Sequence, residues 1–304
     1  MDVVPAGDLK DWQTPPFEAT IVGDYLVGRG VQDDKGPSLA ALYAVKSLLD
    51  DGIQFTKRIR FIFGTDEETL WRCMNRYNQI EEQADLGFAP DSSFPLTYAE
   101  KGLLQVKLHG PGWDDLPLQA GQALNVVPDK ATYAGHRLEE LLPVLDQSGV
   151  QYSQTEDSVT VMGVSKHSKD AAEGVNAIVG LAESLSLIQP HPALLFIADA
   201  VGEDATGEAL FGPISDEPSG DLSFNLATLV IDQEQSEIGI DIRIPVLADK
   251  DALVARLQEI AASYQLEYEE FDYLAPLYVP LDSPLVSSLM AVYQEETGDK
   301  TPAM

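Results

Sequence analysis

The sequence predicts a mixed α/β protein that contains two domains. Its 304 residues exceed the size of an average domain. In the N-terminal third, helical periodicity and apolar runs alternate: we expect a helix at 38–51, a buried strand at 58–64 and a second helix at 65–77. A strand–helix–strand pattern then appears at 123–164 and again at 225–270. Alternation of this kind is typical of α/β layering.

The same criteria predict the elements of the remaining chain. A short apolar run at 86–89 is expected to be another strand of the N-terminal third, after the strand at 58–64. Pro276, Pro280 and Pro284 mark a linker, and a polar loop rich in Gly and Pro is expected at 203–221. Further strands are expected at 103–108, 158–164 and 237–246, and further helices at 138–145, 174–188, 250–264 and 283–297.

Composition excludes several classes of protein. The net charge of −31 repels phosphate backbones, so nucleic-acid binding is not expected. No apolar stretch approaches the roughly 20 residues that a membrane helix needs, and the N-terminus does not resemble a secretory signal. Cys73 is the single cysteine, which suits a cytoplasmic protein. The acidity itself has two interpretations, which are solubility and the binding of cations.

Acidic residues gather where the predicted strands of the N-terminal third end. They are Asp2, the pair Asp33 and Asp34, the run at 66–68, and Asp91. Because the carboxyl ends of strands in an open α/β sheet meet at one edge, these clusters would repel one another unless a cation neutralised them. The alternative is that each cluster caps a helix, since Asp and Glu favour first turns. Spacing alone leaves both interpretations open.

Ordered motifs throughout the chain resemble those of one enzyme family. They are DVVPAGD at 2–8, GRGVQDDKGPSLAALYAVKSLL at 28–49, FGTDEETLWRCM at 63–74, APDSSFPLTYAEKG at 89–102, ALNVVPDKA at 123–131, SFNLATLVI at 223–231 and DIRIP at 241–245. These segments are similar to the co-catalytic zinc aminoacylase/carboxypeptidase family, and most similar to its PepV-type dipeptidases. The resemblance implies a mixed-sheet catalytic domain, formed by 1–103 and 275–304, with an α/β lid domain inserted at 104–274.

The resemblance also implies two zinc ions, with manganese or cobalt as alternatives. Asp33 resembles the carboxylate that bridges the two metals, and in the family its bond to Asp34 is a cis peptide. Glu68 resembles a ligand of one metal and Asp91 a ligand of the other. Asp2 resembles the carboxylate that orients a histidine ligand. Two cations that share one water would make that water acidic.

Four further residues take roles from the resemblance. Glu67 resembles the general base, the alternative being a helix-capping acid. His167 resembles the histidine that polarises the substrate carbonyl, and the alternative is a surface histidine. Arg243 is expected to bind a carboxylate, unless it forms a surface ion pair. Asn125 is expected to hydrogen-bond the substrate. The other three histidines, His109, His136 and His191, match no motif and are interpreted as structural or solvent-facing.

The expected activity is hydrolysis of dipeptides that have a free N-terminus, by a monomer. N-acylated amino acids and β-alanyl dipeptides remain alternative substrates. In the family pattern two histidine ligands would lie just before Met1 and beyond Met304, so each metal is expected to keep two of three protein ligands in this sequence. The alternative function is therefore an inactive fragment or binding module of the same fold. A nucleotide-binding protein is disfavoured because no glycine-rich phosphate motif follows a predicted strand.

Overall fold

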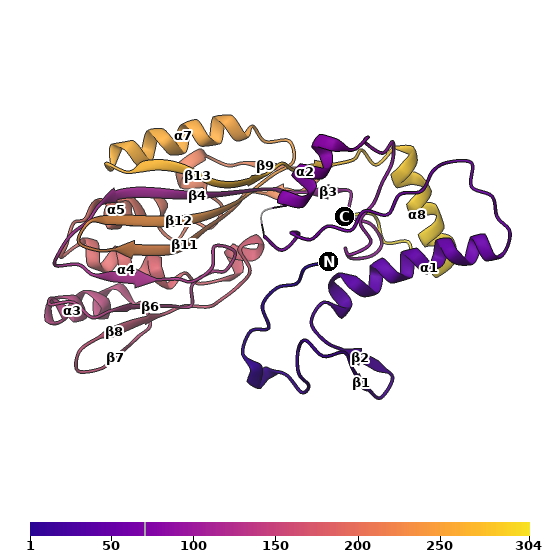
Figure 1. Ribbon diagram of the computed structural model, residues 1–304. Coiled ribbons are helices and arrows are strands. Elements are labelled where there is room, and N and C mark those ends of the chain that lie inside the picture. The colour runs from indigo at the N-terminus through magenta and orange to yellow at the C-terminus, as the bar shows by residue number, and fades with distance from the viewer. Residues whose placement is uncertain (70) are drawn as a thin grey trace. The chain divides into compact units, whose positions relative to one another are not determined.

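The chain is mixed α/β and divides into two compact units. The structure, a computed structural model, describes residues 1–69 and 71–304 (Figure 1). The first unit contains residues 1–97 and 284–303, and the second contains 98–283 and Met304. The expected lid, 104–274, lies within the second unit, whose limits extend several residues further at both ends.

The first unit is built from helices, one hairpin and irregular segments. Phe94 stacks on Tyr293 with ring centroids 5.6 Å apart, which ties the segment before residue 97 to the last helix. Its elements are η1 (Leu9–Asp11), β1 (Thr20–Val22), β2 (Tyr25–Val27), η2 (Val31–Lys35), α1 (Gly36–Asp50), α2 (Arg72–Ile80) and α8 (Pro284–Thr297). The helices expected at 38–51 and 283–297 are confirmed as α1 and α8.

Three expectations for the first unit are wrong. The segments 58–64 and 86–89 form no strand. A strand needs a partner for its backbone groups, and no described segment pairs with either of them. The second helix starts at Arg72 rather than near residue 65, because Asp66 and the residues after it form a turn. The acidic clusters therefore do not follow strands.

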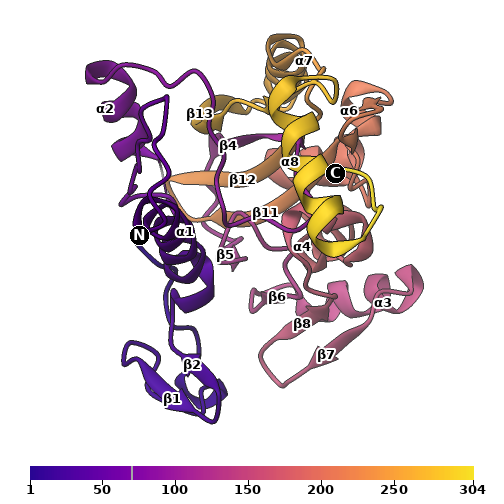
Figure 2. The same ribbon diagram turned by 90° about the vertical axis from the view of Figure 1, so that its right-hand side faces the viewer.

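The second unit contains a five-stranded antiparallel sheet in the order β13-β4-β12-β11-β5. Its strands are β4 (Gly102–Pro111), β5 (Leu118–Ala120), β11 (Ser223–Ile231), β12 (Gln235–Ile244) and β13 (Glu267–Leu274). Figure 2 shows β4, β12 and β11 side by side, as in Figure 1. Arg243 lies opposite Leu103 on β4 and Ser223 on β11.

A three-stranded antiparallel sheet and several helices complete the second unit. The sheet has the order β6-β8-β7. The remaining elements are β3 (Ala99–Glu100), β6 (Lys130–Tyr133), α3 (Leu138–Ser148), β7 (Tyr152–Gln154), β8 (Val159–Met162), η3 (Ser168–Glu173), α4 (Ala177–Ser186), α5 (Pro192–Leu195), η4 (Phe196–Val201), α6 (Glu208–Phe211), β9 (Ser215–Asp216), β10 (Gly220–Asp221), α7 (Lys250–Ser263) and β14 (Leu277–Tyr278). The helices and strands expected after residue 100 are confirmed, with boundaries shifted by a few residues.

Helix α4 lies at the centre of the hydrophobic core. Every residue from Ala177 to Ser186 is buried except Glu183. The side chain of Asn176 caps the helix by accepting hydrogen bonds from the N–H groups of Ile178 and Val179, at 3.0 and 3.3 Å. A helix that is apolar on all sides is stable only inside a protein. Within the described ranges, no helix has the length and apolar character needed to cross a membrane.

Candidate active site

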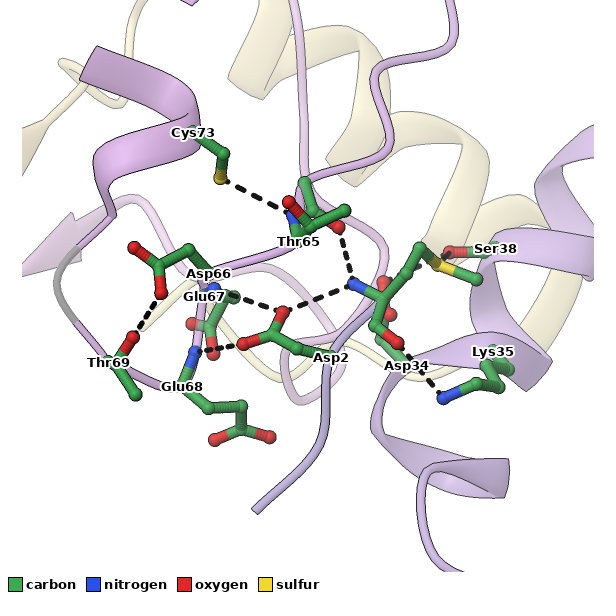
Figure 3. Close-up of polar contacts among 12 residues, drawn as sticks. Asp2, Asp34, Lys35, Ser38, Thr65, Asp66, Glu67, Glu68, Thr69 and Cys73 are labelled. Atoms are coloured by element: carbon green, nitrogen blue, oxygen red, sulfur yellow. Dashed lines mark hydrogen bonds and ion pairs between the residues drawn. The ribbon is translucent and has the colours of Figure 1, made fainter. Parts of the chain in front are cut away.

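One carboxylate fixes the backbone of two consecutive glutamates in the first unit. Asp2 accepts hydrogen bonds from the N–H groups of Glu67 and Glu68, at 3.1 Å and 3.2 Å (Figure 3). Burial raises the pKa of Asp2, but the N–H groups of Glu67, Glu68 and Asp2 itself, together with the charge of the N-terminus, hold the pKa below its ordinary value. Asp2 lies 65 and 66 residues before the two glutamates, so only the fold brings it to them.

Asp66 braces the turn that carries these glutamates. Its carboxylate accepts hydrogen bonds from the backbone N–H of Arg72 at 3.0 Å and from the Arg72 guanidinium at 2.7 and 2.8 Å. The hydroxyl of Thr69 also donates to it. These hydrogen bonds hold the pKa of Asp66 well below its usual range. Asp66 therefore accepts the first backbone N–H of α2, whose N-cap residue is Trp71, and in this respect it fits the capping alternative.

Four acidic side chains act on the carboxyl of Glu67. Its pKa is raised to about 7, first by desolvation and then by the charges of Glu68, Asp33, Asp91 and Asp2. More than a third of the surface of Glu67 nevertheless remains exposed, so its carboxyl group is only partly desolvated. The pKa of Glu68 is raised by desolvation and by Asp33 and Asp2. We call these five residues the carboxylate cluster.

Asp33 enters the carboxylate cluster from the tight turn that precedes α1. The peptide bond between Asp33 and Asp34 is cis, as expected from the resemblance. The carboxylate of Asp34 accepts a hydrogen bond from the Ser38 hydroxyl at 3.0 Å and so belongs to the start of α1. Asp91 lies in an exposed turn.

The donor chemistry of the carboxylate cluster suits a divalent cation. Carboxylate oxygens bind zinc, manganese and magnesium, and a cation would relieve the repulsion that raises the pKa of Glu67. Within residues 1–69 and 71–304, however, no three His, Cys, Asp or Glu side chains are placed to hold one ion. The residues fit a cation in charge and ligand type, and their present spacing does not form a finished site.

In the second unit, the fold brings together the segments that carry Asn125 and His167. The N–H of Ser168 donates to the carbonyl of Asn125 at 2.9 Å, and Val126 pairs with His167. Nδ1 of His167 accepts the N–H of Lys169 at 3.2 Å. The proton of neutral His167 is therefore on Nε2, an assignment made from this hydrogen bond. Burial, and after it the charge of Arg243, lowers the pKa of His167.

Arg243 lies beside the same turn and is held by a buried carboxylate. Its Nε donates to Oδ1 of Asp241 at 2.8 Å, and its Nη2 donates to the hydroxyl of Ser168 at 3.2 Å. Arg243 thus forms an ion pair, as the alternative expected, but its partner is buried rather than at the surface, since the side chain of Asp241 is 0% exposed. We call His167, Ser168, Asp241 and Arg243 the arginine group. Sequence reasoning missed Asp241, although a charge two residues before Arg243 in an apolar strand was a usable signal.

Comparison with known proteins gives one consistent result. The sequence model of Peptidase family M20/M25/M40 matches residues 1–304. "Putative dipeptidase YtjP" of Bacillus subtilis (strain 168) is 35% identical over 99% of this chain and 69% of its own length. "Putative dipeptidase MW1694" of Staphylococcus aureus (strain MW2) is 34% identical over the same shares. The M20 family metallo-carboxypeptidase Sso-CP2 of Sulfolobus solfataricus, at 17% identity, superposes with a TM-score of 0.51 over 98% of this chain and 68% of its own, which shows a shared fold.

Proposed function

Because the chain belongs to peptidase family M20/M25/M40, a family of hydrolases, we propose that it is a metal-dependent dipeptidase acting on dipeptides with a free N-terminus. The names of the two bacterial relatives support dipeptides as substrates. The observation that carries the proposal is the double hydrogen bond from Glu67 and Glu68 to Asp2. It places a free glutamate and a candidate ligand side by side within a cluster of carboxylates.

The carboxylate cluster supplies the ligands in this proposal. Asp33, Glu68 and Asp91 would hold the cations, and zinc is the cation that we propose. A cation bound there would make the attacking water more acidic and would polarise the peptide carbonyl. Asp2 fixes the backbone from which the Glu67 and Glu68 side chains project, which limits their freedom before a substrate arrives.

Glu67 moves the protons of the reaction. Among the described residues its carboxylate makes no hydrogen bond to protein, so it is free to accept a proton from the attacking water. The same carboxyl then gives that proton to the leaving amine, which completes hydrolysis of the peptide bond. The backbone anchor at Asp2 fixes where the side chain starts and leaves its carboxylate available.

In this proposal, residues of the second unit bind the carbonyl and the carboxylate of the substrate. The Nε2–H of His167 is a hydrogen-bond donor for the substrate carbonyl and for the oxyanion that develops from it. Arg243 would bind a carboxylate through the N–H groups that Asp241 and Ser168 leave free, and Asn125 would add a hydrogen bond to the substrate. The fixed proton position of His167 and the anchored guanidinium of Arg243 support these assignments.

The test is turnover of Leu-Leu with added zinc or manganese. We expect the chain to hydrolyse it, and Glu67→Gln to lower kcat by about 10²–10⁴-fold, the usual contribution of a general acid–base group. Glu81→Gln is the matched control, because Glu81 is an exposed glutamate of the same unit outside the carboxylate cluster. It should leave kcat unchanged.

Two results would contradict the proposal. Activity that survives Glu67→Gln would refute the assignment of Glu67 as the general base. No turnover by the unaltered chain with either cation would refute the dipeptidase activity. Binding of Leu-Leu without turnover would instead support the binding-module alternative. That alternative is favoured by one observation, that no three ligating side chains in the described ranges are placed around one point.

A further inference from the structure

Asp241 is a buried charged residue of the central sheet, and its neighbours across the strands are the polar residues Gln105 on β4 and Asn225 on β11. It lies on β12 between Ile240 and Ile242, which are 0% and 1% exposed. Its own side chain is 0% exposed. Burying an ionised carboxylate is costly unless it is paired and its oxygens are hydrogen-bonded. The contacts of Asp241 must therefore offset the cost of burying its carboxylate.

Both oxygens of Asp241 are occupied. Oδ1 accepts Nε of Arg243 at 2.8 Å, and Oδ2 accepts Nη2 of Arg243 at 3.3 Å, so one edge of the guanidinium is held by both oxygens. Oδ2 also accepts the side-chain N–H of Gln105 at 2.9 Å. Gln105 is the residue of β4 directly opposite Asp241 in the sheet. Besides Arg243, the carboxylate is thus held by one neighbouring strand, β4, through Gln105.

Arg243 has one fixed edge and one open edge. The hydroxyl of Ser168, which is fully buried, accepts a second hydrogen bond from Nη2, at 3.2 Å, and so adds to the restraint on the guanidinium. The two N–H groups on Nη1 have no partner among the described residues, and 20% of the side chain is exposed. Lone arginine side chains lose about 2 kcal/mol of rotamer entropy when they are fixed. In this protein the side chain of Arg243 is already ordered before a ligand binds, so binding would not have to offset that entropy cost.

We propose that Asp241 is a positioning residue, which orients Arg243 so that its free N–H groups select substrates ending in a free carboxylate over the corresponding amides. The proposal rests on the function proposed above and assigns the carboxylate side of its specificity. Gln105 and Ser168 support the same orientation from β4 and from η3. Asp241 itself touches no substrate and acts through Arg243.

The test compares the binding of Leu-Leu and of Leu-Leu amide by calorimetry. All proteins carry Glu67→Gln and are measured with zinc present, so that neither ligand is consumed. We expect Leu-Leu to bind more tightly than its amide. Asp241→Asn, which keeps the shape and removes the charge, should weaken Leu-Leu binding about tenfold, equivalent to ~1.4 kcal/mol, and leave the Kd of the amide unchanged.

Two further variants separate positioning from a purely structural role. Asp249→Asn, a matched change at the cap of α7, should alter neither Kd. Adding Asp241→Asn to Arg243→Lys should cause no further loss of Leu-Leu binding, since the two residues act as one unit. Equal weakening of both ligands by Asp241→Asn would show a structural effect and overturn the proposal.

The remaining outcomes distinguish this proposal from the proposed function. If Leu-Leu does not bind, or if the acid and the amide bind equally well, the role of Asp241 is refuted. This holds whether or not the chain that keeps Glu67 shows turnover. Selective binding of the acid that is lost in Asp241→Asn, together with no turnover by the unaltered chain, would support Asp241 and refute the dipeptidase.

Discussion

The two units differ in where their apolar residues lie. In the described ranges, every buried hydrophobic residue except Val286 belongs to the second unit. The contrast is clear between two helices of similar apolar character: α4 is buried almost throughout, whereas α1 has no buried residue and exposes Leu39, Leu48 and Leu49. The carboxylate cluster, with its five acidic residues, belongs to the first unit. The candidate metal ligands and general base therefore lie in the unit with little buried apolar surface, whereas the arginine group lies in the well-packed unit.

The difference between α1 and α4 shows what can and cannot be predicted from helical periodicity. A repeated apolar pattern predicts that a helix forms, and α1 and α4 both form, but the pattern does not predict how much of the apolar face becomes buried. Burial depends on partners that are distant in the sequence. The stabilising contribution of the same residue type should therefore differ strongly between the units.

The largest expected effect on stability comes from truncating a leucine in each unit. Leu185 in α4 is 0% exposed, and Leu185→Ala should lower the free energy of unfolding by about 2–5 kcal/mol, through lost burial and the cavity that remains. Leu49 in α1 is 55% exposed, and Leu49→Ala should change it by about 0.5 kcal/mol or less. Urea denaturation of both variants measures this, and equal losses would contradict the comparison.

The extent to which the sequence predicted the fold also differs between the units. The strand at 237–246 and the helix at 250–264 were found as β12 and α7, because their patterns coincide with real burial. The segment 58–64 has the composition of a strand, yet it forms none. Strand propensity expresses how a residue fits a paired, half-buried surface, and the sequence does not show whether a partner is present.

The candidate site was accessible to sequence reasoning only through motifs. Residue types identified Glu67 and Asp33 as candidates, but the expected arrangement at strand ends was wrong. Asp2 meets Glu67 and Glu68 through backbone contacts that span 65 and 66 residues, and no local spacing encodes these. Asp241 was missed because its importance depends on Gln105, which lies 136 residues away. Pairing across a sheet is a property of the fold.

The next effect, on activity alone, concerns Asp2 in the first unit. Asp2→Ala removes the acceptor for the N–H groups of Glu67 and Glu68, so the backbone that carries these two side chains loses its anchor. We expect kcat for Leu-Leu to fall about 10–100-fold, as for other residues that orient ligands. The midpoint of thermal unfolding should stay close to that of the unaltered chain, because Asp2 is only partly buried and Val286 is the only buried hydrophobic residue among the described residues of the first unit.

Asp85→Ala is the matched control for Asp2, since Asp85 is an exposed aspartate of the same unit. It should change neither kcat nor the unfolding midpoint. A large loss of stability in Asp2→Ala would instead assign Asp2 to the folding of the first unit and would weaken the separation between packing and chemistry.

A pH-dependent effect is expected in the second unit, at His191. The ring is 1% exposed, Nε2 donates to the carbonyl of Pro111 at 3.0 Å, and Nδ1 accepts the N–H of Ala193 at 3.1 Å. Both nitrogens are thus committed in the neutral form. Burial lowers the pKa of His191 despite the opposing hydrogen bond to Pro111. As the pH falls below about 6.5, the unfolded chain binds a proton that the folded chain resists.

Stability from neutral His191 is therefore complete above the unfolded pKa and is lost as the pH decreases. The loss should approach at most about 1.4 kcal/mol per pH unit in the window between the unfolded pKa and the lower folded pKa. His191→Gln cannot titrate, so its difference from the unaltered chain should shrink between pH 7 and pH 5 in urea denaturation. A constant difference would show that protonation of His191 is not linked to folding. His109, whose Nε2 lies 2.6 Å from Glu269 on an exposed face, supplies the control through His109→Gln.

The smallest effect compares two helix caps. Asp249 accepts the N–H groups of Asp251 and Ala252 at 3.0 and 3.1 Å and caps the 14-residue helix α7, which packs in the second unit. Asp249→Ala should therefore cost about 1 kcal/mol of unfolding free energy. Asp8 makes the same kind of cap at 3.0 Å, but on the three-residue η1, which has no buried residue. Because no packed element depends on η1, Asp8→Ala should cost too little for urea denaturation to resolve, and a loss equal to that of Asp249→Ala would show that the first unit unfolds as cooperatively as the second.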